Sequence, residues 1–69
     1  MPKEITVRLH MPATQATALA QFVKRLDFET CATFASPCAV YNGVPECDTM
    51  WASIDTLRSA LADAGFAPR

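Results

Sequence analysis

Apolar and polar residues alternate near the start of the chain, and this alternation predicts a strand over residues 4–10. Ile5, Val7 and Leu9 fall on one side of the expected strand. The other side carries the polar residues Glu4, Thr6, Arg8 and His10. A strict period of two with β-branched residues is typical of a strand that has one face covered and one face in water. We therefore expect Ile5, Val7 and Leu9 to face a core or a second chain.

Two later segments show the spacing of amphipathic helices, and we expect helices over residues 12–27 and 47–64. Pro12 suits the first position of a helix because its φ is fixed and it lacks an N–H. The apolar side of the first helix combines Ala16, Leu19, Ala20, Phe22, Val23 and Leu26. That of the second combines Cys47, Met50, Trp51, Ile54, Leu57, Leu61 and Ala64. Gly65 is placed to end the second helix in a left-handed conformation, with Phe66 making the apolar contact that accompanies such an end.

Residues 28–46, between the two expected helices, carry mixed signals and are predicted to be irregular. Residues 28–35 have apolar positions at helical spacing, enough for a turn or two of helix. Pro37 disfavours a longer helix, because the residue before a proline avoids the helical conformation. The Asn42-Gly43 pair is a strong turn signal. Pro45 follows it so closely that we expect too little room for a full hairpin.

These elements predict a small single α+β domain, residues 1–69, in which one strand precedes two helices. A lone strand leaves its backbone N–H and C=O groups unpaired, and helices packed on one of its faces do not pair them. Two partners fit: residues 38–41 of the same chain, or residues 4–10 of a second copy across a two-fold axis. A second copy would also enlarge a core that is small for a domain of this size. We therefore predict a homodimer joined through the strand, with internal pairing as the alternative.

The length of 69 residues and the composition restrict the class of protein. Hydrophobic residues make up 51% and charged residues 19% of the chain, a balance that excludes a disordered tail or a low-complexity linker. No apolar run approaches the roughly 18 residues that a membrane-spanning helix needs. The opening Met1-Pro2-Lys3-Glu4 does not begin a secretory signal. We expect a cytoplasmic protein that does not enter membranes.

The residues that catalysis or metal binding needs form no recognisable pattern, so we predict no enzyme activity, no cofactor and no metal. His10 is the single histidine, and the chain has no Gly-rich phosphate loop and no Gly-x-Ser-x-Gly motif. Cys31, Cys38 and Cys47 are too few for a disulfide framework. Together with His10 they would supply four zinc ligands, but their spacing lacks the close cysteine pair of a zinc knuckle.

The large and acidic residues of the second half predict a protein-binding surface. Trp51 and Tyr41 are of the types that anchor protein interfaces. Residues 1–26 carry four cations and one carboxylate, a sum of +3, whereas residues 27–69 carry two cations and six carboxylates, a sum of −4. Such a separation can orient a charged partner. We predict that the surface consists of Tyr41, Asn42, Glu46, Asp48, Trp51 and Asp55.

DNA binding is the alternative function. A strand followed by two helices is also how ribbon-helix-helix repressors begin, and these proteins pair two strands into a ribbon that enters the major groove. In such a dimeric regulator Thr6, Arg8 and His10 would face the bases, and Lys24 and Arg25 would contact phosphates. The net charge of −1 and the long irregular segment after the first helix count against this alternative.

The chain contains the segments Ile5-Thr6-Val7-Arg8-Leu9, Gln15-Ala16-x-Ala18-Leu19-Ala20-Gln21-Phe22-Val23-Lys24-Arg25 and, at its end, Ala64-Gly65-Phe66-Ala67-Pro68-Arg69. These segments resemble a family of short, uncharacterised proteins of phages, prophages and other mobile elements. Members of that family carry a shorter, more acidic segment where this chain has residues 36–46. The resemblance implies a small accessory protein that binds and inhibits a host or defence complex, as anti-CRISPR proteins do. It implies the cytoplasm of the host cell as the location.

Overall fold

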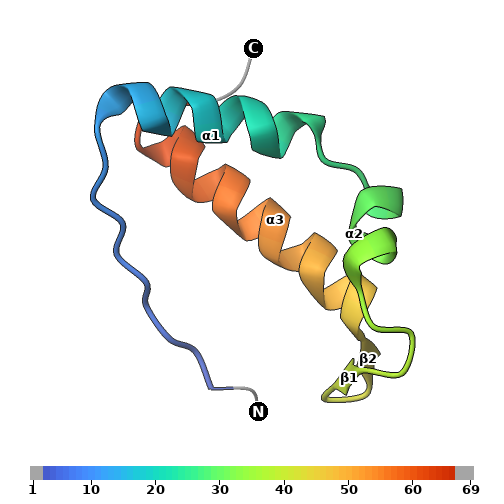
Figure 1. Ribbon diagram of the computed structural model, residues 1–69. Helices are drawn as coiled ribbons and strands as arrows, with labels where there is room; N and C mark the ends of the chain where they lie inside the picture. Colours follow the sequence, from blue (N-terminus) through green and yellow to red (C-terminus); the bar gives the residue numbers. More distant parts are fainter. Residues whose placement is uncertain (1–2, 67–69) are drawn as a thin grey trace.

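Three helices and a short hairpin follow an extended N-terminal segment in the computed structural model, which describes residues 3–66 (Figure 1). The elements are α1 (Ala13–Arg25), α2 (Phe28–Phe34), β1 (Val40–Tyr41), β2 (Val44–Pro45) and α3 (Glu46–Asp63). Helices and a two-stranded antiparallel sheet in one small domain confirm the α+β class. No helix of the described residues is long and apolar enough to span a membrane. Residues 67–69 of the closing motif lie outside the described residues.

The first helix ends earlier than predicted, because a second helix begins in the segment predicted to be irregular. α1 starts directly after Pro12 but ends at Arg25, and Leu26 is extended with a ψ of 144°. The Asp27 carboxylate then accepts hydrogen bonds from the Thr30 N–H at 2.8 Å and from the Thr30 hydroxyl at 2.6 Å. An aspartate in this position stabilises a helix start, because it satisfies an N–H that has no partner within the helix. The Asp27 cap therefore produces α2.

The expectation that the chain lacks room for a hairpin is also wrong. The Asn42-Gly43 pair forms a two-residue turn with φ angles of 51° and 82°, as a type I′ turn requires. Pro45 lies opposite Val40, at a pair in which the ladder uses neither N–H. The missing N–H of proline therefore costs the hairpin nothing. The next bond, from the Glu46 N–H to the Ala39 C=O at 3.0 Å, joins the hairpin to the start of α3.

The end of α3 confirms the prediction made for Gly65. The helix runs one residue ahead of the predicted 47–64 at both ends, and Gly65 follows it with a φ of 92°. The Gly65 N–H donates to the Ala62 C=O at 3.0 Å, and the Phe66 N–H donates to the Leu61 C=O at 2.8 Å. These two bonds are the Schellman pattern of a helix end. They turn Phe66 back onto the core.

The strand predicted over residues 4–10 does not form in the single chain. Residues 3–12 are extended, but they pair with no other segment of residues 3–66, and the sheet lies at residues 40–45 instead. The internal partner considered for this strand pairs with another segment instead. Val40 and Tyr41, which end the segment 38–41, pair with β2.

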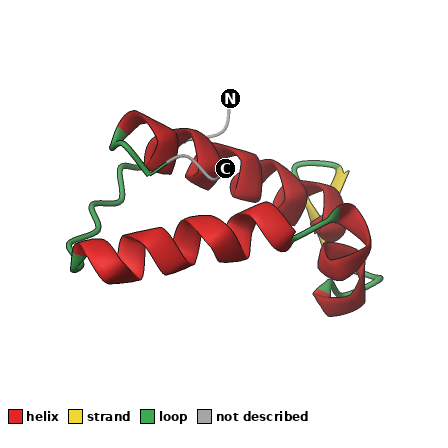
Figure 2. Ribbon diagram, turned by 90° about the horizontal axis from the view of Figure 1, so that it is seen from above, coloured by secondary structure: helices red, strands yellow, loops and turns green. Residues whose placement is uncertain are grey.

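The packed core lies between α1 and α3 and is small (Figure 2). Val23 is 1% exposed and clusters with Ala20 and Leu61. Four partly buried residues pack around this cluster: Leu19, Ile54, Leu57 and Phe66. The Arg58 guanidinium also reaches across from α3, and its Nη2 donates to the Val23 C=O at 3.4 Å. The contact between the two long helices therefore forms the most deeply buried part of the domain.

Replacing Val23 by alanine tests this core. The change removes two methyl groups from the most closely packed position, so we expect the free energy of unfolding to fall by about 2 kcal/mol. The same change at Val40, which is 58% exposed, is the control and should cost less than about 0.5 kcal/mol. Urea unfolding followed by circular dichroism measures both variants. Equal losses at the two positions would contradict the placement of the core.

Candidate functional site

Residues 3–10 form an extended segment outside the helical core, which we call the N-terminal arm (Figure 1). Every residue of the arm is exposed. Its large apolar side chains, Ile5, Val7 and Leu9, are 79%, 70% and 59% exposed. Among the described residues, no backbone N–H or C=O of the arm makes a backbone hydrogen bond. The arm thus combines an unpaired strand edge with a row of apolar side chains, two features that favour association with another chain.

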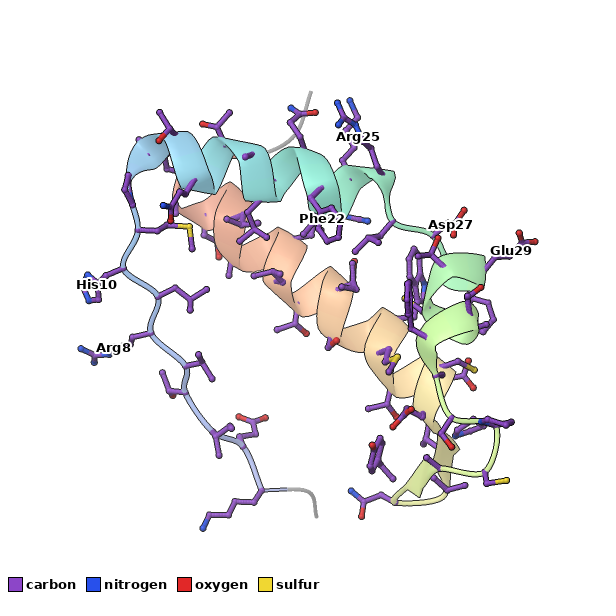
Figure 3. All side chains as sticks on the ribbon, viewed as in Figure 1. Arg8, His10, Phe22, Arg25, Asp27 and Glu29 are labelled. Carbon is purple, nitrogen blue, oxygen red and sulfur yellow. The ribbon has the colours of Figure 1, made fainter. Side chains whose placement is uncertain are left out.

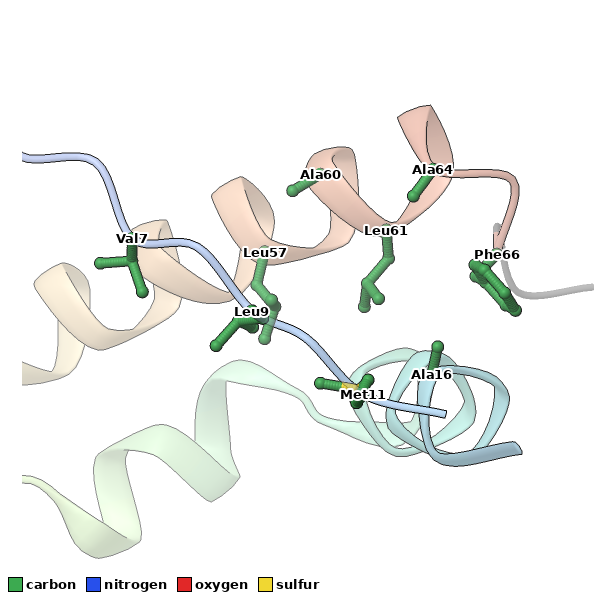
Figure 4. A pocket seen from close by; sticks show the side chains of 9 residues that line it. All are labelled: Val7, Leu9, Met11, Ala16, Leu57, Ala60, Leu61, Ala64 and Phe66. Atoms are coloured by element: carbon green, nitrogen blue, oxygen red, sulfur yellow. The ribbon is translucent and has the colours of Figure 1, made fainter. Parts of the chain in front are cut away.

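The two sides of the arm point in opposite directions. Arg8 and His10 point away from the helices (Figure 3). Val7 and Leu9 are on the other side, where they line a groove together with residues of α3 (Figure 4). This arrangement agrees with the alternation in the sequence, although the arm has no strand partner in the single chain.

An open groove of about 290 Å³ lies between the arm, the start of α1 and the second half of α3, and we call it the arm groove (Figure 4). Its lining consists of Val7, Leu9, Met11, Ala16, Leu57, Ala60, Leu61, Ala64 and Phe66. All of these side chains are apolar, and none carries a charge. A site for a small substrate usually adds a few convergent polar groups to its apolar walls. The arm groove is therefore suited to receive apolar side chains.

A second apolar groove, of about 390 Å³, lies where α1, α2 and α3 meet, and we call it the corner groove. Its lining consists of Phe22, Leu26, Thr30, Cys31, Phe34, Met50, Ser53 and Ile54. The sequence pattern places Phe22 on the buried side of the first helix, but Phe22 is 60% exposed and Phe34 is 77% exposed. The signal that could have found this groove is the width of the apolar stripe of α1, which one neighbouring helix cannot cover.

The structure divides the predicted protein-binding surface into two groups. Tyr41 and Asn42 on the hairpin and Asp48 and Asp55 on α3 are exposed. The other two residues, Glu46 and Trp51, are half-buried. Trp51 packs edge-on against the Phe28 ring, with the ring centroids 6.5 Å apart and the planes at 84°, an arrangement that stabilises aromatic pairs. Trp51 therefore contributes to the contact between α2 and α3.

Glu46 links three segments of the chain through hydrogen bonds. Its carboxylate accepts one bond from the Tyr41 hydroxyl and one from the Ser36 N–H, the latter at 2.7 Å. The bond from Tyr41 and, to a lesser extent, the bond from Ser36 lower the pKa of Glu46, because both favour the ionised carboxylate. The bond to Glu46 and its negative charge raise the pKa of Tyr41 in return. Glu46 therefore fixes the hairpin and the end of α2 at the start of α3.

The residues predicted to contact DNA are not brought together in the single chain. Arg8 and His10 lie on the arm, with Thr6 next to them in sequence, whereas Lys24 and Arg25 form the last turn of α1. Figure 3 shows Arg25 at the end of α1 that is remote from the arm. One objection to the DNA alternative is weaker than the sequence suggests, because only two residues separate α1 from α2. A second helix therefore does follow the first directly.

The cysteines and His10 form no metal site in the part of the chain that the structure describes. Cys31 is buried, Cys38 is exposed and Cys47 is half-buried, and all three are free. No three histidine, cysteine, aspartate or glutamate side chains of residues 3–66 gather in a way that could hold a metal ion. Cys31 lines the corner groove, where a thiol acts as a small hydrophobic group.

The bond between Tyr41 and Glu46 predicts a measurable pH dependence, because Tyr41 is the only tyrosine of the chain. We expect its phenol to titrate above pH 10.0, its ordinary pKa. A group whose pKa is raised by folding stabilises the native state below its unfolded pKa and loses this effect as the pH rises through the native pKa. For Glu46, whose pKa is lowered from 4.5, the stabilisation is present above that pH and is lost as the pH falls. Ultraviolet absorbance of the phenolate follows the Tyr41 titration.

A pair of amide variants provides the control for this titration. Glu46→Gln removes the charge that Tyr41 contacts, so the Tyr41 midpoint should return toward pH 10.0. Asp48→Asn removes an equal charge from the same turn of α3 and should leave the midpoint unchanged. An unaltered midpoint in Glu46→Gln would contradict the proposed link.

Comparison with known proteins yields a family but no activity. The comparisons found no match among curated proteins or among solved structures. One family model matches the chain over residues 1–69. The chain therefore belongs to the family that is described as a family of unknown function (DUF7706).

Proposed function

We propose that this chain is a non-enzymatic protein-binding module that works as a homodimer joined by its N-terminal arms. The observation that supports the proposal is the arm itself, whose apolar residues are 59% to 79% exposed. Its backbone has no partner among the described residues. A second extended chain is the structure that satisfies such an edge. A second copy brings an identical edge with the same spacing of apolar residues.

Antiparallel pairing centred on Val7 suits the sequence of the arm. Val7 then lies opposite Val7 of the second copy, and Ile5 lies opposite Leu9, so every large apolar residue meets another one. A shift by one residue would place apolar residues opposite polar ones. On the polar side, the Glu4 carboxylate lies opposite the His10 imidazole of the second copy, a pair that can form a hydrogen bond across the strands.

The surface that we propose for a protein target is the exposed part of the predicted set. It consists of Tyr41, Asn42, Asp48 and Asp55. Asp48 and Asp55 lie two helical turns apart and therefore on one side of α3. Their charge favours a target with a basic surface. The resemblance to mobile-element proteins supports a host or defence protein, inhibited by this contact, as that target.

DNA binding through the paired arms is the second candidate function. The observation that favours it is the outward direction of Arg8 and His10 (Figure 3), which a two-stranded ribbon would present together with Thr6. The short connection between α1 and α2 also fits a DNA-binding ribbon followed by helices. The net charge of −1 favours the protein-binding function over this candidate.

Solution mass tests the dimer. We expect light scattering after size exclusion to give about 15 kDa, twice the chain mass of 7.5 kDa, with and without reductant. Val7→Asp should give a monomer, because two carboxylates would then face each other across the two-fold axis. Thr6→Asp makes the same change one residue away on the polar side and should keep the dimer. A monomeric wild-type chain, or equal dissociation of both variants, would contradict pairing through the arms.

A titration with labelled duplex DNA separates the two candidate functions. For a protein-binding module we expect no change in fluorescence anisotropy at about 50 mM salt, a condition that favours phosphate contacts. A rise that disappears at about 200 mM salt and in Arg8→Ala would replace the proposed function by that of a DNA-binding regulator.

A further inference from the structure

We propose that the second copy covers the open side of α3 together with the corner groove, so that packed helices form a second layer beneath the paired arms. The open side of α3 consists of Met50, Ser53, Leu57, Ala60 and Ala64. This inference rests on the homodimer proposed above and names the surface that completes it.

Both grooves open along this one side of the helix. Each of its five residues lines either the arm groove or the corner groove. They recur every three or four residues, a spacing that places them on one side of a helix. Ser53, Ala60 and Ala64 are exposed, and none of the five side chains is charged. The two grooves therefore share one side of α3.

Pairing of the arms does not by itself remove their apolar side chains from water. Side chains stand out from the faces of a strand pair, so they need a layer of other residues beneath them. In the single chain this layer is incomplete, since Val7 and Leu9 line the arm groove and still remain 70% and 59% exposed. Helices of the second copy would close the groove.

The exposed area of the chain is large enough to supply such an interface. Its accessible surface is 5674 Å², whereas a compact protein of this mass exposes about 4,200 Å². The excess of roughly 1,400 Å² is larger than the roughly 800 Å² that each partner contributes to an interface of standard size. The radius of gyration points the same way, at 13.4 Å against about 11 Å for a compact domain of this length.

The open side of α3 has a shape that fits a second copy of itself. Met50 makes one end bulky, and the exposed rings of Phe22 and Phe34 line the same groove. Ala60 and Ala64 give the other end small side chains that leave room for a larger one. A two-fold axis near Leu57 would bring the bulky end of each copy against the end with small side chains of the other.

Charge excludes the other side of α3 from the same role. That side carries Asp48 and Asp55, which are exposed. A two-fold contact there would bring the carboxylates of both copies together, and only Asp55 has a cation near it, Arg58 at 4.0 Å. The uncharged open side carries no such penalty, so of the two sides of α3 it is the one that suits a two-fold contact with a second copy.

Two matched arginine variants test this surface. Ala60 and Ala52 are both exposed alanines within α3, but only Ala60 lines a groove. We expect Ala60→Arg to raise the dissociation constant of the dimer at least about tenfold, because the interface would bury an unpaired charge. Ala52→Arg should stay within about twofold of the wild type. Sedimentation equilibrium measures the constants, and circular dichroism confirms that both variants keep their helices.

A second variant and a second readout distinguish this inference from the proposed function. Phe34→Ser alters the corner groove at a residue that is 77% exposed, so the change leaves the core intact and should also weaken the dimer. Hydrogen exchange at residues 4–10 reports arm pairing independently. One result would overturn the covering of α3 but retain the arm-paired dimer: the arm amides are protected, and neither Ala60→Arg nor Phe34→Ser changes the dissociation constant. Equal weakening by Ala60→Arg and Ala52→Arg would also overturn it, and a monomeric wild-type chain would overturn both proposals.

Discussion

An extended arm that carries apolar side chains but has no backbone partner within residues 3–66 is the feature that the proposed association would satisfy. The helices satisfy their own backbone groups, and the hairpin pairs its two strands. The arm has neither arrangement available within residues 3–66. Water can bond to its N–H and C=O groups, but the side chains of Ile5, Val7 and Leu9 lower the free energy only when they are removed from water. Hydrogen bonds would therefore pair the two backbones, and the apolar side chains would set the register and the strength of the pairing.

The polar groups with altered pKa values serve the fold. Altered pKa values often mark catalytic sites, but structural hydrogen bonds produce them as well. The pKa of Asp27 is lowered chiefly by the Thr30 hydroxyl and then by the Thr30 N–H at the start of α2. That of Glu46 is lowered by bonds that hold the hairpin. In both residues the carboxylate is already occupied by neighbours in the chain, and neither residue lines the arm groove or the corner groove.

Elements with a repeated apolar spacing could be predicted from the sequence, and elements that depend on one specific short-range contact could not. The apolar spacing of α1 and α3 repeats over several turns, so both helices form close to their predicted bounds. Gly65 adopts the left-handed conformation that was predicted to end α3. α2 depends on the hydrogen bonds between Asp27 and Thr30. The hairpin depends on Pro45 falling at a pair that needs no N–H. Neither condition is visible in hydrophobic periodicity.

In the candidate site, the type of a residue did not predict whether its side chain is exposed or buried. Trp51 and Glu46 belong to the predicted binding surface, yet Trp51 packs on Phe28 and Glu46 holds the hairpin. A side chain that suits an interface suits a small core equally well, because both remove apolar area from water. Phe22 and Phe34 show the converse, since both are large and apolar and yet remain 60% and 77% exposed. Only the packing of α2 and α3 decides which aromatic residues remain outside.

In the proposed dimer the two sides of α3 have separate roles. The uncharged side would face the second copy, so the exposed Asp48 and Asp55 and the hairpin with Tyr41 and Asn42 would remain at the outer surface. Each dimer would then present this acidic surface twice. A target with two basic sites within reach would bind the second surface at a high effective concentration once the first is engaged. Dimerisation would thus stabilise a small domain and also strengthen its binding to the target, although the acidic surface of each copy would contain no additional residue.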